Sequence, residues 1–206
     1  MSGIVTVTTP AASTALTTLA AAQDDLGGAA PSDLGFLARV VAQASAAIVA
    51  HLRTPLARET VIEMFRDVCA WRDLPLSRRP VATITSIVVD GITLDADEWE
   101  LGGEASWLYR LSDDRRVDWT GAKIVVTYAG GYILPGAAGA NLPADIERAC
   151  LITIAAAVQA QGRDPALRSE SADGIGAQSW LDPRSDHGAL PWQAAELLAP
   201  HRRYGA

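Results

Sequence analysis

The spacing of apolar residues changes twice along the chain and divides it into three stretches. Over residues 34–48 the apolar side chains recur at steps of three and four, which is the spacing of one helix face. Over residues 57–128 the period becomes two and β-branched residues dominate, which is typical of strands. A four-residue spacing returns over residues 146–158 and predicts another helix.

Start and stop signals place the expected helices more closely. A short first helix is predicted over residues 13–26 and is closed by a glycine pair. We expect Ser32 to be the N-cap of the second helix, which ends near residues 53–55 because proline disfavours helix in the residue before it. Pro143 opens the third helix as its first residue. A short terminal helix is predicted over residues 190–201.

The middle stretch predicts antiparallel strands. Residues 81–94 form a hairpin around Asp90-Gly91. The other predicted strands follow the same alternation, and they cover residues 57–65, 99–101, 107–111 and 123–128. Residues 66–76 are interpreted as a connection, residues 113–116 as a charged turn and residues 1–12 as an extended segment.

This order of elements favours an α+β fold over a doubly wound parallel sheet. We expect N-terminal helices, a central antiparallel β block, a following helix and an extended C-terminal arm that ends in a short helix. The predicted domains are an extended N-terminal segment (1–12), a core domain (13–161) and an arm for partner docking (162–206), since residues 162–189 lack periodicity.

Composition excludes a chain that is disordered throughout and disfavours a DNA-binding protein, although a local basic patch stays open. The 206 residues are 49% hydrophobic and 20% charged, so the chain is too apolar to be disordered throughout. Its 17 basic and 24 acidic residues give a net charge of −7, and Lys123 is the only lysine. Because affinity for nucleic acid comes mainly from neutralising phosphates, this charge argues against a DNA-binding protein.

The two cysteines and the apolar runs bear on location. Cys69 and Cys150 form no Cys-x-x-Cys pair, and we interpret both as reduced, buried, small hydrophobic residues of a cytoplasmic product. No signal-peptide pattern is visible, and the longest candidate apolar run, residues 149–160, is too short to span a membrane. We therefore expect no membrane association.

Motifs for catalysis, cofactors or metals are not found in the sequence. The three histidines lack metal-ligand spacing, and neither a phosphate-binding loop nor a Gly-x-Ser-x-Gly motif is present. The acidic residues near position 97 are interpreted as a solvated turn, and Trp99 and Trp107 as sheet packing. Trp180 and Trp192 stand in a stretch with little core of its own, which indicates anchors for a partner surface. We expect no enzyme and no cofactor.

Taken together, four motifs resemble the head–tail connector (adaptor) family of long-tailed phages over roughly residues 16–160. The first motif is an alanine-rich helix that runs into Arg-x-Pro-Leu over residues 44–56. The second is Arg79-Pro80-Val81 together with the strand that follows it to Gly91. The third is the strand Val-Thr-Tyr-x-x-Gly-Tyr that ends at Tyr132, and the fourth is the helix start over residues 142–149. The first helix departs from the family, because Leu19-Ala-Ala-Ala-Gln23 replaces a charged pattern.

The resemblance implies a structural role. Members of that family form a ring, commonly of twelve copies, that docks beneath the portal protein and above a tail-side stopper protein. It implies a virion or phage-like particle neck that is assembled in the host cytoplasm and lets DNA pass without specific binding. The alanine and arginine bias also fits a gene transfer agent, a domesticated phage-like particle.

Three groups of residues are the expected contact sites. An arm that reaches the portal would use apolar and basic side chains: Trp180, Leu181, Trp192, Leu197, Leu198, Arg202, Arg203 and Tyr204. Contacts between copies would use the small face of the second helix: Ala42, Ala46, Ala50 and Arg53. Acids that line the lumen and repel DNA would be Asp95, Asp97 and Glu98.

Three other functions stay open at the level of sequence. The chain could be another neck or tail-completion protein of the stopper type, which would dock at a different place. An unrecognised small hydrolase would need a nucleophile that no motif supplies. A DNA-binding subunit of the terminase type is disfavoured by the net charge.

Overall fold

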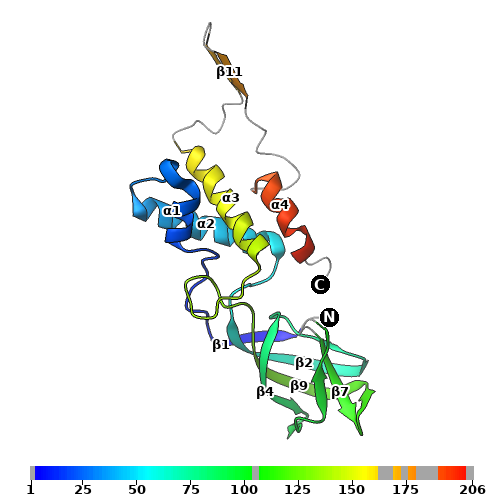
Figure 1. Cartoon of the computed structure of the whole chain (residues 1–206). Helices are drawn as coiled ribbons and strands as arrows, with labels where there is room; N and C mark the ends of the chain where they lie inside the picture. The colour runs from blue at the N-terminus through cyan, green and yellow to red at the C-terminus, as the bar shows by residue number, and fades with distance from the viewer. Residues whose placement is uncertain (1–2, 104–106, 162–168, 173–175, 180–189, 203–206) are drawn as a thin grey trace. The chain divides into compact units, whose positions relative to one another are not determined.

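A computed structural model describes residues 3–103, 107–161, 169–172, 176–179 and 190–202 (Figure 1). It confirms the α+β fold, with helices at both ends of the chain and antiparallel sheets between them. The chain divides into two compact units. We call residues 3–14 with 54–141 the β unit, and residues 15–53 with 142–202 the helical unit. The boundary between the units runs through the expected core of residues 13–161.

The larger sheet of the β unit has five antiparallel strands in the order β1-β2-β9-β4-β5. The strands are β1 (Ile4–Thr9), β2 (Glu59–Trp71), β4 (Val81–Val89), β5 (Ile92–Thr93) and β9 (Trp119–Gly130). The predicted hairpin is formed by β4 and β5. Central strand β9 alternates buried and less buried side chains along most of its length, as the period of two predicts.

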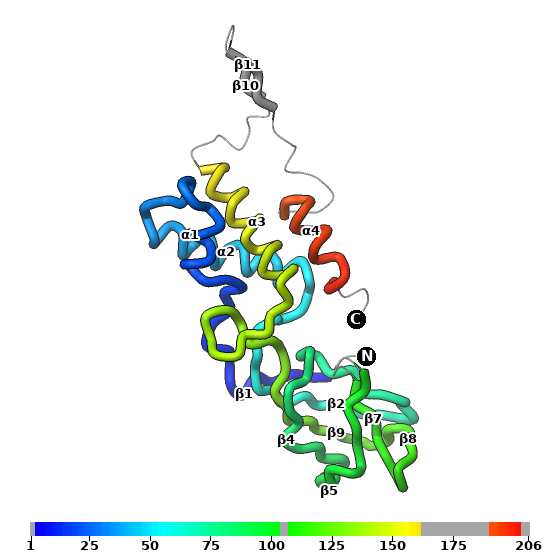
Figure 2. The backbone as a smooth tube through the Cα atoms, in the orientation of Figure 1, coloured from blue at the N-terminus to red at the C-terminus, as the bar shows by residue number. Residues whose placement is uncertain are grey.

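The smaller sheet has the order β3-β7-β6. β3 pairs with the first residues of β7, and β8 pairs with its last residues (Figure 2 labels β7 and β8). Its strands are β3 (Leu74–Pro75), β6 (Trp99–Leu101), β7 (Trp107–Ser112) and β8 (Arg115–Val117). One hydrophobic cluster joins the two sheets, and its largest buried members are Trp119, Tyr128 and Phe65. Trp99 packs against this cluster as expected, whereas Trp107 is 37% exposed.

Two predicted connections of the β unit are partly strand. β2 continues to Trp71 through the stretch expected to be a connection, because positive φ angles at Asp67 and Ala70 accommodate an irregularity in its pairing with β9. In the predicted charged turn only Asp113 and Asp114 turn, both with positive φ, and β8 begins immediately after them.

The described part of the helical unit contains four α-helices and two 3-10 turns, besides a short hairpin. The helices and turns are α1 (Leu19–Leu26), η1 (Gly27–Ala29), α2 (Leu34–Leu52), α3 (Ala144–Gln159), α4 (Trp192–Leu198) and η3 (Ala199–His201). The first helix begins later than predicted, because the Thr18 hydroxyl caps it by accepting the Ala21 N–H at 3.1 Å. Helix α3 begins at Ala144, so Pro143 is its N-cap and not its first residue as predicted, and α4 confirms the terminal helix.

The cap of α2 also differs from the prediction by one residue. The Asp33 carboxylate accepts the Phe36 N–H at 3.0 Å, so Asp33 and not Ser32 is the N-cap. The helix ends at Arg53, which adopts a left-handed conformation. By its length and a mean hydropathy of 1.4, α2 could cross a membrane, but seven of its residues are buried in the unit and core helices meet the same criterion.

Ser45 ties α2 to its neighbours. Its hydroxyl accepts the Leu16 N–H at 3.0 Å and donates to the Val41 carbonyl at 2.8 Å. The Cys150 sulfur lies 3.8 Å away, and burial raises the pKa of that thiol to about 11. Cys150 is thus a buried, free cysteine as predicted; Cys69 is free but exposed, so the prediction that it is buried was wrong. It lies in the irregular end of β2, between Val68 and Trp71.

Part of the stretch expected to lack structure forms a hairpin. Strands β10 (Ser169–Ala172) and β11 (Gly176–Ser179) pair antiparallel in a two-stranded sheet of their own. A two-stranded sheet by itself is only marginally stable in water.

Candidate assembly surfaces

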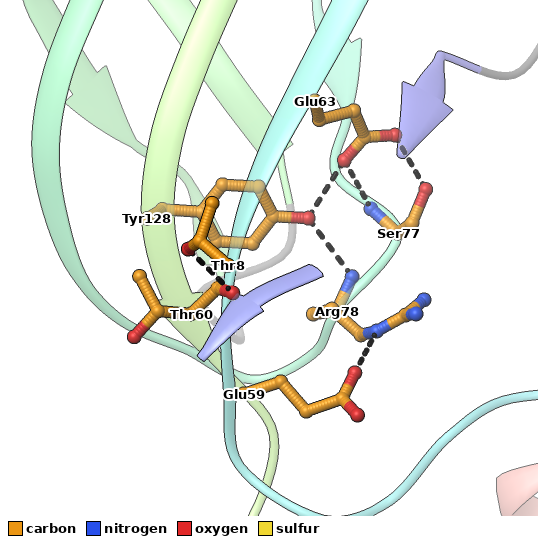
Figure 3. Close-up of polar contacts among 7 residues, drawn as sticks. All are labelled: Thr8, Glu59, Thr60, Glu63, Ser77, Arg78 and Tyr128. Atoms are coloured by element: carbon orange, nitrogen blue, oxygen red, sulfur yellow. Dashed lines mark hydrogen bonds and ion pairs between the residues drawn. The ribbon is translucent and has the colours of Figure 1, made fainter. Parts of the chain in front are cut away.

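The most buried acidic side chain of the β unit is Glu63, on β2 (Figure 3). Its carboxylate accepts the Ser77 N–H at 3.0 Å, the Tyr128 hydroxyl at 2.7 Å and the Ser77 hydroxyl. The Tyr128 oxygen in turn accepts the Arg78 N–H at 3.0 Å. Burial, followed by the charge of Glu63, raises the pKa of Tyr128 well above its usual range, so the phenol stays protonated and donates.

Two arginines flank this cluster. Arg78 forms an ion pair with Glu59 at 2.9 Å. Arg79 donates through Nε to the Leu76 carbonyl at 2.8 Å and stacks on the Trp107 ring, 4.8 Å from its centre. Burial lowers the pKa of Arg79, and the charges of Tyr128 and Glu63 oppose that shift. These contacts therefore hold Ser77, Arg78 and Arg79, which precede β4, against the sheet.

This geometry is structural, because the Glu63 carboxylate and the Tyr128 hydroxyl are both occupied by internal hydrogen bonds. Among the described residues, no group of three His, Cys, Asp or Glu side chains could hold a metal ion. The sequence analysis did not single out Glu63. The available signal was its position in the alternation of β2, where it occupies a buried site between Val61 and Phe65.

A cavity of about 430 Å³ opens in the β unit beside the smaller sheet. Two arginines and two aspartates line it, together with Tyr109 and Val117: Arg72, Arg116, Asp73 and Asp118. The Arg116 guanidinium stacks 3.9 Å from the centre of the Tyr109 ring and forms an ion pair with Glu100. Since the opposite charges balance, the cavity lacks the positive field that would hold a phosphate.

The four residues expected to contact a neighbouring copy share one side of α2. Ala42, Ala46, Ala50 and Arg53 are all exposed, at steps of four, four and three along the helix. The buried side of α2 includes Leu37, Val41, Ala44 and Ile48, as the spacing predicts, whereas Leu34 is 51% exposed. The exposed face formed by these four residues is therefore accessible to a partner.

The acids expected to face a lumen lie in the turn between β5 and β6. Asp95 and Asp97 are exposed, and Glu98 is half-buried. The Glu98 carboxylate accepts the Asp95 N–H at 2.8 Å, and the Glu98 N–H donates to the Asp95 carbonyl at 3.1 Å. Glu98 therefore stabilises the turn, while Asp95 and Asp97 present their charges to solvent.

The residues expected to dock on a portal fall into three groups. Trp180, Leu181, Arg203 and Tyr204 lie outside the described residues. Leu198 is fully buried and Leu197 half-buried, because α4 packs on α3 within the helical unit. Trp192 is 46% exposed and Arg202 is exposed. Of the described residues, Trp192 and Arg202 are accessible to a partner, and Leu198 is occupied inside the unit.

A polar contact fixes the end of this terminal helix. His201 contacts the Asp145 carboxylate at 2.6 Å, from η3 to the first turn of α3. The contact lowers the pKa of Asp145, against an opposing effect of burial. The terminal helix is thus attached to α3 through the buried Leu198 and through this polar contact.

No family model and no curated protein matches the chain. Solved structures share its α+β fold over nearly the whole chain, and three of these structures come from gene transfer agent particles. A chain from the neck of an empty gene transfer agent particle, computed with C6 symmetry, is 22% identical with a TM-score of 0.58. A chain from the virion of a native gene transfer agent particle is 20% identical with a TM-score of 0.56.

A third similar chain, from the neck of the native particle computed with C12 symmetry, is 20% identical with a TM-score of 0.54. Each of these alignments covers 98% of this chain and 97% of the other chain. The similarity therefore includes both the β unit and the helical unit. At this identity it establishes a shared fold.

Proposed function

We propose that the protein is a head–tail connector (adaptor) subunit in the neck of a gene transfer agent or a related phage-like particle. It joins the capsid to the tail and performs no catalysis. The proposal depends mainly on one observation, the alignment with neck chains over 98% of this chain and 97% of the other. The motif order that resembles the adaptor family supports it independently.

The subunits assemble into a ring of twelve copies beneath the portal. Two of the similar chains come from necks computed with C6 and C12 symmetry. Cyclic assemblies close through head-to-tail contacts that use two different surfaces of each copy. The exposed small face of α2, with Ala42, Ala46, Ala50 and Arg53, allows a neighbouring copy to approach closely and supplies one such surface.

The C-terminal arm binds the portal, and a tail-side stopper protein binds the opposite end of the ring. Among the described residues of the arm, Trp192 is an exposed aromatic side chain and so fits an anchor. Replacing Trp192 with alanine should weaken capture by immobilised portal protein at least tenfold. The matched control is Leu34→Ala, which also removes an exposed apolar side chain from the helical unit and should leave capture unchanged. Equal capture of the two variants contradicts the role of the arm.

The ring lets DNA pass without specific binding. The net charge of −7 and the exposed carboxylates of Asp95 and Asp97 repel phosphate, whereas a basic lining would hold it. Reversing one charge with Asp97→Lys should slow DNA delivery and leave ring assembly intact. Asp24→Lys changes the net charge equally at another exposed site and serves as the control. Normal delivery by Asp97→Lys particles contradicts a lumen position for this turn.

A stopper-type or other tail-completion protein of the neck is the alternative, because the similar chains are identified by their place in the neck and virion. It differs in its docking partner. A pull-down with portal protein alone captures an adaptor but not a stopper.

The decisive experiment is electron microscopy of the purified protein mixed with portal protein. We expect class averages to show a ring coaxial with the portal, with twelvefold symmetry in end views. A protein that leaves the portal bare, while it binds tail components, is not the adaptor.

A further inference from the structure

The five-stranded sheet of the β unit has two edges that carry no charged side chain. β1 forms one edge with the sequence Ile-Val-Thr-Val-Thr-Thr. At the other edge, β5 pairs only with Val88 and Val89, and the next backbone hydrogen bond joins Leu94 to Ile87 at 2.9 Å. In the described chain, residues 81–86 of β4 therefore have no strand on their outer side. Their sequence is Val-Ala-Thr-Ile-Thr-Ser.

Free edges of this kind attract other strands. An edge strand presents unpaired backbone N–H and C=O groups, and proteins usually protect it with charged side chains, proline or a covering segment. β1 contains no such residue, and its side chains at Ile4 and Val7 are 58% and 41% exposed. β-branched residues of both edges favour the extended conformation that pairing needs.

The two edges match in direction and length. β1 is antiparallel to β2, β2 to β9 and β9 to β4, so β1 and β4 run in opposite directions within one copy. A second copy that continues the sheet in the same orientation thus presents its β4 antiparallel to β1. β1 has six residues, and the free part of β4, residues 81–86, has the same length.

Irregularities on both strands introduce curvature. The pairing of β4 with β9 shifts between Val81 and Thr83 and again between Ile84 and Ser86, and that of β1 with β2 shifts between Val7 and Thr9. Bulges bend a strand and increase its twist. A sheet that continues from copy to copy around an axis has to bend in this way.

We propose that β1 of one copy pairs antiparallel with residues 81–86 of β4 in the next copy, so that the sheets of the β units join head to tail around the ring. This inference rests on the proposed ring and identifies a second copy of this chain as the partner of both edges. Pairing of β1 with another β1 uses the same surface twice and ends at a two-fold dimer, whereas pairing of two different edges can close a ring.

Disulfide trapping between copies tests the pairing. In a Cys69→Ser background, one variant carries Thr6→Cys on β1 and a second carries Thr83→Cys on β4. The two are mixed, assembled with portal protein and oxidised mildly. Because the two variants enter the ring at random, a disulfide can form only where a Thr6→Cys copy lies beside a Thr83→Cys copy. We therefore expect up to about half of the protein to run as a covalent dimer on a non-reducing gel. In the control, the second variant carries Ser112→Cys on exposed β7 of the other sheet, and few dimers should form.

Equal cross-linking to Thr83→Cys and Ser112→Cys overturns the proposal. Stronger cross-linking of Thr6→Cys to Ser171→Cys on β10 also overturns it, because the hairpin of β10 and β11 is then the strand donor. Since a cysteine can disturb a strand, each variant is first compared with the parent by thermal unfolding.

A charge on the edge gives a second readout. Val7→Lys should reduce the yield of rings on the portal at least tenfold, because lysine on an edge opposes pairing. Val117→Lys places the same charge at a side chain of similar exposure, 37%, on β8 of the other sheet and should leave the yield unchanged. Rings of normal yield from folded Val7→Lys protein overturn the edge pairing and leave the adaptor function intact. A parent protein that forms no ring on the portal overturns both.

Discussion

The β unit and the helical unit bury different kinds of side chains. The core of the β unit is built around large residues, with Trp119 and Tyr128 fully buried and Phe65 nearly so, and it encloses the charged Glu63. In the described helical unit no buried apolar residue is aromatic, and five of them are alanines: Ala22, Ala44, Ala149, Ala194 and Ala195. The β unit therefore concentrates its stability in a few residues, whereas the helical unit spreads it over many small contacts.

This difference changes how the alanine-rich composition is understood. The small residues do not make the whole molecule weakly packed, because they gather in one unit while the aromatic core lies in the other. A subunit of an assembly can tolerate a unit whose core contains few large side chains if neighbouring copies bury the remaining surface of that unit. The helical unit is the one with an exposed small face on α2, which fits that role.

The largest expected effect is the removal of the buried carboxylate in the β unit. Glu63→Ala should lower the free energy of unfolding by about 3–5 kcal/mol, because Tyr128 and Ser77 lose their acceptor inside the protein and Arg79 loses a nearby negative charge. Urea unfolding followed by tryptophan fluorescence measures the change. As a control, Glu98→Ala removes a carboxylate from a surface turn and should lower the free energy of unfolding by under about 1 kcal/mol. A similar loss for the two variants contradicts the structural role of Glu63.

A matched pair of substitutions compares the two cores directly. Ile87 in the β unit and Ile154 in the helical unit are each 1% exposed. Ile87→Ala should cost about 4 kcal/mol, since large, rigid neighbours leave a cavity, and Ile154→Ala about 2 kcal/mol, since helices with small side chains can shift together. Chemical denaturation of both variants gives the two values. A larger loss for Ile154→Ala reverses the comparison.

Within the helical unit, the hydroxyl of Ser45 has a larger effect than its size suggests. Ser45→Ala should destabilise the protein by about 1–2 kcal/mol, because the buried Leu16 N–H then has no acceptor there. Thr153→Ser serves as the control, since it keeps the hydroxyl bond to the Ala149 carbonyl and should be nearly neutral. Thermal unfolding compares both with the parent, and equal melting temperatures of all three proteins refute the prediction.

The start of α2 provides a smaller effect. Asp33→Ala should cost about 1 kcal/mol because it removes the acceptor of the Phe36 N–H, and Ser32→Ala should cost almost none. Helix content by circular dichroism during thermal unfolding gives both values. The opposite ranking makes Ser32 the cap, as the sequence predicts.

The smallest expected effect is a pH dependence of the terminal helix. The pKa of Asp145 is lowered in the folded protein by its contact with His201, so this contribution to stability is complete above the ordinary pKa of aspartate, about 4, and is lost as the pH falls through the lowered value. Amide hydrogen exchange of α4, compared with Asp145→Asn, should show faster opening at acid pH only in the parent. If amide exchange of α4 depends on pH in the same way in the parent and in Asp145→Asn, the prediction is wrong.

The sequence predicted the elements whose apolar spacing is regular. The stripe of Leu37, Val41, Ala44 and Ile48, the hairpin around Asp90-Gly91 and the helix with buried Ile146, Cys150 and Ile154 all lie where they were expected. In these elements the local pattern and the final packing agree, so either one predicts the other.

The sequence failed where packing overrides local preference. β2 continues through the charged pair Arg66-Asp67, because β9 keeps the pairing in register there and resumes it at Trp71 after an irregularity beyond Val68. Glu63 escaped notice because a buried acid requires partners that come from distant segments, here Ser77 and Tyr128. The assembly surfaces could be predicted only as exposed residues, since their partners lie on other molecules.

The position of the β unit between α2 and α3 affects synthesis of the chain. After α2 leaves the ribosome, about 90 residues of the β unit must be translated before α3 appears, which takes roughly 5–20 s at usual elongation rates. During this interval α2 lacks α3, one of the helices on which it finally packs. Chaperone demand and losses to aggregation should therefore depend on how fast residues 54–141 are translated, and synonymous codons in that stretch become a means of controlling the yield of the protein.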